Sequence, residues 1–184
     1  MTRIVIVGGG YAGFYTAFKL EKLLRRGEAE VVVIDPLPYM TYQPFLPEVA
    51  AGSIEARHAI VPLRRHLPKT RVITGRVTGV DHAKKKVTVT PEGFADFSLD
   101  YDHLVITAGA VSRTFPIPGV ADCAIGMKTI EEAIAIRDRV IDNLHVAADL
   151  WIDSGNSFAD GQMSTHHTEE CWFEGRCETH TMGG

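Results

Sequence analysis

The sequence has few cysteines, and they come late. Of 184 residues only three are cysteine, at Cys123, Cys171 and Cys177. This number and spacing exclude a disulfide framework of the kind that holds small secreted domains together. We therefore expect a protein of a reducing compartment, the cytoplasm.

Long apolar runs and clusters of one charge are also lacking. No stretch reaches the length of a membrane-spanning helix, and Arg3 leads directly into a strand pattern rather than into a secretory signal. The formal net charge is −4, and no face of clustered Lys and Arg indicates a nucleic-acid binder. We expect neither a nucleic-acid partner nor a membrane span.

The composition that remains is that of an ordinary globular protein. Hydrophobic residues make up 45% of the chain and charged residues 23%. The length allows one domain, with or without an appendage, but not a large two-domain enzyme. Residues 151–184 carry six acidic side chains and one basic side chain, and they show neither helical nor strand periodicity. We therefore predict a domain over residues 1–150 and an irregular or disordered tail over 151–184.

The first 35 residues have the pattern of one β-turn-α-β unit. Ile4–Val7 and Val31–Ile34 are β-branched runs without polar alternation, which is typical of strands buried on both faces of a parallel sheet. Between them, Tyr11–Arg26 has apolar residues at helical spacing, and Gly27 is predicted to end that helix.

The turn of this unit, Gly8–Gly13, matches the G-x-G-x-x-G pattern of dinucleotide-binding folds. Gly8 permits the tight turn, Gly10 lets the backbone approach a pyrophosphate, and Gly13 allows close packing of helix on strand. Asp35 ends the second strand, where an acid can bind ribose hydroxyls. The alternative is a Gly-rich turn without a ligand. The order of strand, turn, helix and acid favours the nucleotide site.

Beyond this unit the sequence predicts short helices, a small β insertion and one long helix. Helical stretches near 48–51 and 60–66 are expected to line a site rather than to join a sheet. Thr129 and Glu132 form a capping box for a helix over Thr129–Val146. The predicted strands are Arg71–Val80, Lys86–Thr90, Phe97–Leu99 and Tyr101–Ile106.

Two segments, Tyr39–Gly52 and Tyr101–Ala110, resemble the flavin-binding segments of type II NADH:quinone dehydrogenases. The resemblance implies an α/β fold: a Rossmann-like FAD-binding domain with a parallel sheet and a small antiparallel β insertion. In that family the first Gly-rich turn binds FAD, and hydride passes from NADH through FAD to a membrane quinone. Disulfide-using flavoprotein reductases are disfavoured, because no cysteine precedes Cys123.

The resemblance also implies which residues contact the cofactor. Asp35 would bind the FAD ribose, Val77 would offer its backbone to the adenine, and Gln43 and Pro44 would form part of the wall near the flavin ring. No protein nucleophile is implied, because the reactive atom belongs to the cofactor. The cofactor-binding residues expected are Gly8, Gly10, Tyr11, Ala12, Gly13, Asp35, Gln43, Pro44, Val77, Thr107, Ala108 and Gly109.

No second Gly-rich unit for NADH follows Leu150, so the predicted domain is incomplete. One hypothesis is the FAD-binding portion of an NAD(P)H:quinone oxidoreductase, with FAD, NADH and a quinone as partners and membrane association only in the full-length family. The second is a truncated remnant that binds a dinucleotide without hydride transfer. A third is a zinc-binding tail, disfavoured because paired C-x-x-C spacing is missing. Its ligands would come from His166, His167, Cys171, Cys177 and His180.

Overall fold

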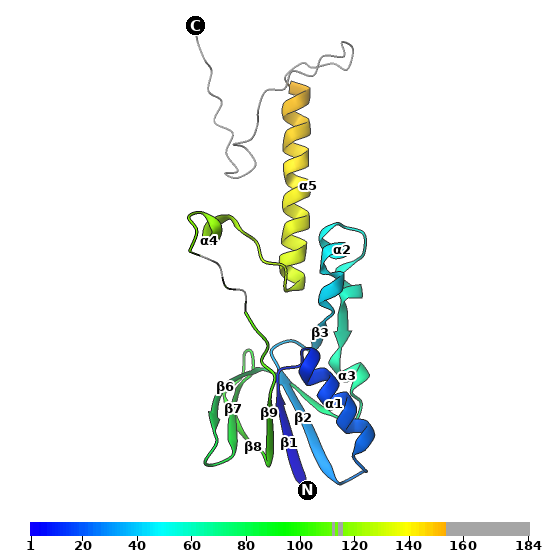
Figure 1. Ribbon diagram of the computed structural model, residues 1–184, viewed down its shortest axis with the longest axis vertical. Helices are drawn as coiled ribbons and strands as arrows, with labels where there is room; N and C mark the ends of the chain where they lie inside the picture. The colour runs from blue at the N-terminus through cyan, green and yellow to red at the C-terminus, as the bar shows by residue number, and fades with distance from the viewer. Residues whose placement is uncertain (112, 114–115, 154–184) are drawn as a thin grey trace.

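The computed structural model describes residues 1–111, 113 and 116–153 and has a four-stranded parallel sheet at its centre (Figure 1). The strand order is β5-β2-β1-β9, so the chain steps from β1 to one side and returns on the other side for β9. This is the topology of a Rossmann-like fold, and it confirms the predicted fold class. The strands are β1 (Thr2–Val7), β2 (Ala29–Asp35), β5 (Arg71–Thr74) and β9 (His103–Ile106).

Both faces of the parallel sheet are covered, as the strand patterns predict. On β2, Val31 and Val33 belong to one buried cluster with residues of helices α1 (Tyr11–Leu23) and α3 (Leu63–His66). Val32 and Ile34 belong to a second cluster with residues of an antiparallel sheet. That sheet is the predicted β insertion, and its strands are β6 (Arg76–Asp81), β7 (Lys86–Thr90) and β8 (Phe97–Asp100).

The segment predicted as a single strand over Arg71–Val80 is two strands in two different sheets. The break lies at Gly75, whose backbone N–H donates to the Asp35 carbonyl oxygen at 2.9 Å. A side chain there would come within 3.0 Å of Val89 Cγ1. Gly75 is therefore the point at which the chain leaves the parallel sheet for the antiparallel one.

Two local predictions are wrong in detail. Helix α1 ends at Leu23 with Leu24 already extended, so Gly27 (φ +85°) lies in the following turn and does not end the helix. The stretch predicted as helical over 60–66 begins as strand β4 (Ile60–Pro62), which pairs with β3 (Tyr39–Thr41) before α3 starts. Pairing with a distant segment therefore overrides the local helical pattern.

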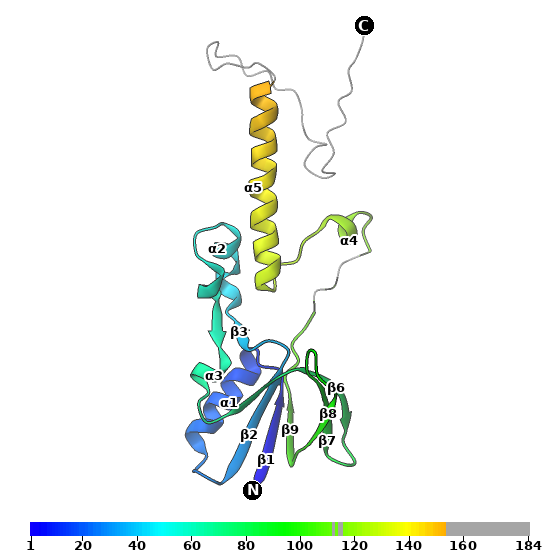
Figure 2. The same ribbon diagram turned by 180° about the vertical axis from the view of Figure 1, so that it is seen from behind.

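The long helix α5 (Ile130–Asp153) confirms the predicted helix and extends past its predicted end at Val146. Figures 1 and 2 show it leaving the body of the molecule, with α2 (Leu46–Ala50) beside its first turns. Ile130 and Ala133 are buried there against Leu46 and Val49. Among the described residues no helix is both long and apolar enough to cross a membrane. The remaining short elements are η1 (Gln43–Phe45), η2 (Ala56–Ala59) and α4 (Val120–Cys123).

Candidate dinucleotide-binding site

The Gly-rich turn lies where the carboxyl ends of β1, β2 and β9 meet. Gly8 N donates to the Ile34 carbonyl oxygen of β2 at 2.8 Å, and Thr107 N donates to the Val7 carbonyl oxygen at 2.8 Å. The Thr107 hydroxyl lies 2.9 Å from the carbonyl oxygens of both Val7 and Gly8, to which it can donate. The turn is thus fixed from both sides, at the point where the strand order reverses. Ligands of open α/β sheets bind at such points.

Two of the three motif glycines are required by the fold itself. Gly8 has φ +100°, and a Cβ there would overlap the Thr107 carbonyl oxygen. A Cβ on Gly13 would overlap the Gly8 carbonyl oxygen, because α1 lies directly against the turn. A side chain at Gly8 would separate the turn from the backbone that follows β9, and one at Gly13 would push the helix off the turn.

Gly10 is different, because nothing occupies the space beside it. It has φ −68°, and a Cβ there would have no heavy atom within 4 Å. Gly10 is the N-cap of α1, no side chain caps this end, and the first turn contains no acidic residue. The free N–H groups and positive dipole end of a 13-residue helix therefore face an open space that suits a phosphate group.

Asp35 points at this turn from the end of β2. Its Oδ2 accepts a hydrogen bond from Gly9 N at 2.6 Å, and its Oδ1 accepts one from Leu37 N at 2.7 Å. Each carboxylate oxygen keeps a lone pair for a further donor. Gly9 has no role in the G-x-G-x-x-G reading, yet a Cβ there would approach Leu63 Cδ1 to 2.7 Å. The run of three glycines is the sequence signal that could have indicated a need for glycine at position 9.

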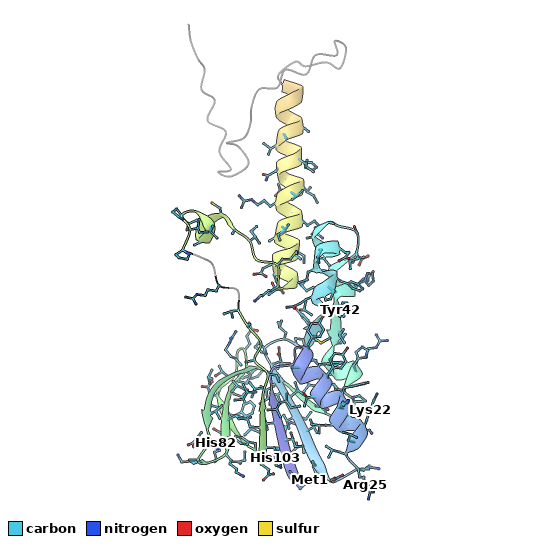
Figure 3. The ribbon with its side chains drawn as sticks, in the orientation of Figure 1. Met1, Lys22, Arg25, Tyr42, His82 and His103 are labelled. Atoms are coloured by element: carbon cyan, nitrogen blue, oxygen red, sulfur yellow. The ribbon has the colours of Figure 1, made fainter. Side chains whose placement is uncertain are left out.

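An aromatic cluster lies at the start of α1. Tyr11 and Tyr42 have ring centroids 6.2 Å apart, and Tyr42 and Phe45 are 4.9 Å apart in an edge-on arrangement. Burial raises the pKa of the Tyr11 hydroxyl, while a hydrogen bond with the Gln43 backbone acts in the opposite direction. Gln43 and Pro44 lie between Tyr42 and Phe45 in the chain, so these ring contacts place them near the start of α1, and Figure 3 shows Tyr42 at this end of α1.

The other expected residues take different positions. Ala108 and Gly109 follow Thr107 and are exposed, and Gly109 has φ +74° with open space around it. Val77 lies in β6 of the antiparallel sheet, where its side chain packs against the second buried cluster. Sequence reasoning missed Gly9 and Tyr42, because neither a middle glycine nor a single tyrosine is specific to a site.

The tail residues proposed as zinc ligands, from His166 to His180, lie outside the described residues. Within the described part of the chain, no three His, Cys, Asp or Glu side chains are grouped closely enough to hold a metal ion.

Comparison with known proteins identifies the fold family. Residues 2–147 match the family model described as pyridine nucleotide-disulphide oxidoreductase. The chain belongs to this family. The match covers the described domain from β1 into α5, and it includes the Gly-rich turn.

Relatives within the family are named for quinone reduction. The chain is 37% identical over 155 residues to the mitochondrial external alternative NAD(P)H-ubiquinone oxidoreductase B2 of Arabidopsis thaliana, covering 79% of this chain and 26% of that one. It is 35% identical over 138 residues to the type II NADH:quinone oxidoreductase of Staphylococcus aureus, covering 74% and 32%. These relatives confirm the predicted resemblance to type II NADH:quinone dehydrogenases.

A solved structure agrees with the sequence relatives. NDH2 of Plasmodium falciparum in complex with NADH matches with a TM-score of 0.71 at 26% identity, over 80% of this chain and 30% of that one. The chain thus spans about a quarter to a third of the length of these relatives.

Proposed function

We propose that residues 1–150 are the FAD-binding portion of an NAD(P)H:quinone oxidoreductase, which transfers hydride from NADH through FAD to a quinone. The observation that carries the proposal is the open, uncapped start of α1 at Gly10. A diphosphate fits this position, because it would satisfy free backbone N–H groups and meet a positive helix end. FAD is proposed as the dinucleotide at this first turn because the family resemblance assigns NADH to a second Gly-rich turn.

Each expected residue receives a proposed task. Asp35 accepts hydrogen bonds from ribose hydroxyls and, as an anion, repels a 2′-phosphate. Tyr11, Gln43 and Pro44 form a wall near the flavin ring, beside the aromatic rings of Tyr42 and Phe45. Backbone contacts come from the glycine turn, from the segment that follows β9, and from Val77 on β6 of the antiparallel sheet. The residues of the turn and of that segment are Gly8, Gly10, Ala12, Gly13, Thr107, Ala108 and Gly109.

The residues of this chain bind and orient the cofactor. FAD, when bound, supplies the hydride chemistry, and no side chain of this chain is assigned as a nucleophile or a general acid. The scarcity of cysteine supports a reducing compartment such as the cytoplasm. Membrane contact is proposed only for full-length members of the family.

A second candidate is a chain that binds the dinucleotide without transferring hydride. The sequence contains a single G-x-G-x-x-G turn, and the family resemblance assigns NADH to a second one. Under this alternative the Gly10 site holds FAD, and NADH does not bind beside it.

One experiment separates the two candidates. The visible spectrum of the purified chain reports bound flavin, and stoichiometric NADH is then added under anaerobic conditions, followed in a second step by a soluble quinone. Bleaching of the flavin by stoichiometric NADH supports the oxidoreductase. Bound flavin that does not bleach supports the second candidate. A chain that retains no flavin and instead carries stoichiometric zinc would refute both and would favour the zinc-binding tail.

A further inference from the structure

A cavity of about 470 Å³ lies at the opposite edge of the parallel sheet from the Gly-rich turn. It is formed where α1 ends and β2 begins, and Figure 3 shows Arg25 at this end, near Met1, with Tyr42 at the other. Its walls combine three cationic side chains with apolar ones. The residues that matter are Glu21, Leu24, Arg25, Arg26, Val31 and Lys69.

The acid in this cavity is already engaged. Glu21 Oε1 accepts hydrogen bonds from Lys69 N at 2.8 Å and from the Thr70 hydroxyl at 2.7 Å. Lys69 Nζ donates to the Glu21 carbonyl oxygen at 3.1 Å, which holds the ammonium group against the helix end. Glu21 therefore holds Lys69 in position through these hydrogen bonds, and the Lys69 ammonium group keeps N–H donors for a ligand.

The two arginines have no acidic partner among the described residues. No ion pair there joins Arg25 or Arg26 to a carboxylate, and the nearby Glu28 accepts a hydrogen bond from the backbone N–H of Arg25 at 2.9 Å. The C-terminal end of α1 contributes a partial charge of about −0.5. Three full positive charges slightly exceed the sum of this partial charge and the two carboxylate charges of Glu21 and Glu28, so the cavity has a small net positive charge.

The apolar part of the wall limits the kind of anion. Val31 is buried and Leu24 is half-buried, and both face the cavity. Leu23, the last residue of α1, is 74% exposed beside this end of the molecule. A ligand that combines a phosphate group with an apolar body would contact both parts of the wall.

We propose that this cavity is a second anion site, in which Arg25, Arg26 and Lys69 bind a phosphate group. The guanidinium groups offer paired donors to phosphate oxygens, and the ammonium group adds a point charge. The phosphate can be a free anion or the headgroup of an anionic lipid whose chains pass Leu23. The site is separate from the Gly-rich turn, and it does not depend on the function proposed above.

The test is an amide-resolved titration of the ¹⁵N-labelled chain with inorganic phosphate. We expect saturable shifts at the amides of Gly27 and Lys69. The double variant Arg25→Gln/Lys69→Gln should weaken this binding by about tenfold or more, because two charge-assisted contacts are lost. The control Lys19→Gln/Arg65→Gln removes the same net charge from exposed residues outside the cavity, and it should bind as the parent does.

A second arm distinguishes the two sources of phosphate. Sedimentation with phosphatidylcholine vesicles, with and without phosphatidylglycerol, is compared for the same variants. Phosphate shifts without vesicle binding identify a soluble ligand, whereas binding to phosphatidylglycerol vesicles that only the cavity variant loses identifies a lipid headgroup. The proposal is overturned if neither probe separates the cavity variant from the control, or if phosphate shifts only Gly8–Gly10.

Discussion

Single glycines of the turn serve two different purposes. Gly8 and Gly13 have no space for a side chain, because the Thr107 and Gly8 carbonyl oxygens occupy the positions that a Cβ would take. Gly10 has ordinary backbone angles and free space. Gly8 and Gly13 are therefore needed for folding. At Gly10 the fold would accept a side chain, so the reason for glycine there is the space that a ligand needs.

Replacing Gly10 tests the ligand without dismantling the turn. Gly10→Val should abolish flavin retention, because the side chain fills the space assigned to the diphosphate. The free energy of unfolding of the apo chain should fall by only about 1 kcal/mol, since valine is a poor N-cap. Flavin content by absorbance and urea unfolding measure the two effects. Thr16→Val, on the same helix, is the control, and unchanged flavin in Gly10→Val would contradict the assignment.

Replacing Gly13 should instead affect mainly the free energy of unfolding of the apo chain. Gly13→Ala places a methyl group on the Gly8 carbonyl oxygen, which forces α1 away from β1. We expect a loss of about 1–3 kcal/mol in the free energy of unfolding of the apo chain, as for other overpacked sites. Urea denaturation without flavin measures it. A variant as stable as the parent would show that helix and strand are not in close contact here.

Among the elements, helix α5 has a capped first turn, whereas apolar side chains further along it are exposed. The predicted capping box is present: Glu132 N donates to Thr129 Oγ1 at 3.2 Å, and Thr129 N donates to Glu132 Oε2 at 3.0 Å. Glu132 Oε2 also accepts from Lys128 N at 2.6 Å. Further along, Leu144 is 56% exposed, so packing holds only the beginning of this helix.

The cap can be tested through its two halves. Thr129→Ala should lower the free energy of unfolding by about 1 kcal/mol, the usual contribution of such a cap. Glu132→Ala should cost at least as much, because its carboxylate accepts two backbone N–H groups. Urea unfolding followed by circular dichroism measures both. Equal stability of both variants and the parent would mean that the cap bonds do not form in solution.

A matched pair of charges tests how far the packing of α5 extends. Ile130 is 8% exposed and Leu144 is 56% exposed on the same helix. Ile130→Glu should lower the free energy of unfolding by about 3 kcal/mol or more, since it buries an unpaired carboxylate. Leu144→Glu should change stability by less than about 0.5 kcal/mol. Thermal unfolding compares them, and a large loss in Leu144→Glu would show that this part of α5 is covered.

On the scale of the whole molecule, the buried apolar residues form three separate clusters, and each stabilises a different region. Two of them lie on the opposite faces of the parallel sheet, and the third joins α2, η2 and the start of α5. Ile6 belongs to the first of these clusters, and Val49 to the third. The two regions are therefore expected to open with different free energies.

Hydrogen exchange can reveal this division. Ile6→Ala removes a fully buried side chain of β1 and should cost about 2–5 kcal/mol, with faster exchange throughout the parallel sheet. Val49→Ala should accelerate exchange mainly in α2 and the first turns of α5. Mass spectrometry of peptic fragments provides the readout. If Val49→Ala accelerated exchange in β1 and β2 equally, the chain would unfold as one cooperative unit.

The sequence alone determined the β-turn-α-β unit, the doubly covered strands, the β insertion and the capping box. Each depends on contacts between residues close in the chain or on a repeated apolar pattern, such as Val31–Ile34, and these survive without knowledge of distant partners. The Gly-rich turn belongs to the same group, because strand, glycines, helix and acid follow one another at the spacing of a dinucleotide-binding unit.

Only the tertiary structure decided where local patterns give way to distant neighbours. One predicted strand is split at Gly75 because its first half pairs with β2 and its second half with β7, and Ile60–Pro62 becomes a strand because it pairs with Tyr39–Thr41. The hydrogen bond from Gly9 to the Asp35 carboxylate and the cavity beneath α1 likewise join residues far apart in the chain. Such contacts carry no local signal, since their free energy arises only when the fold brings the partners together.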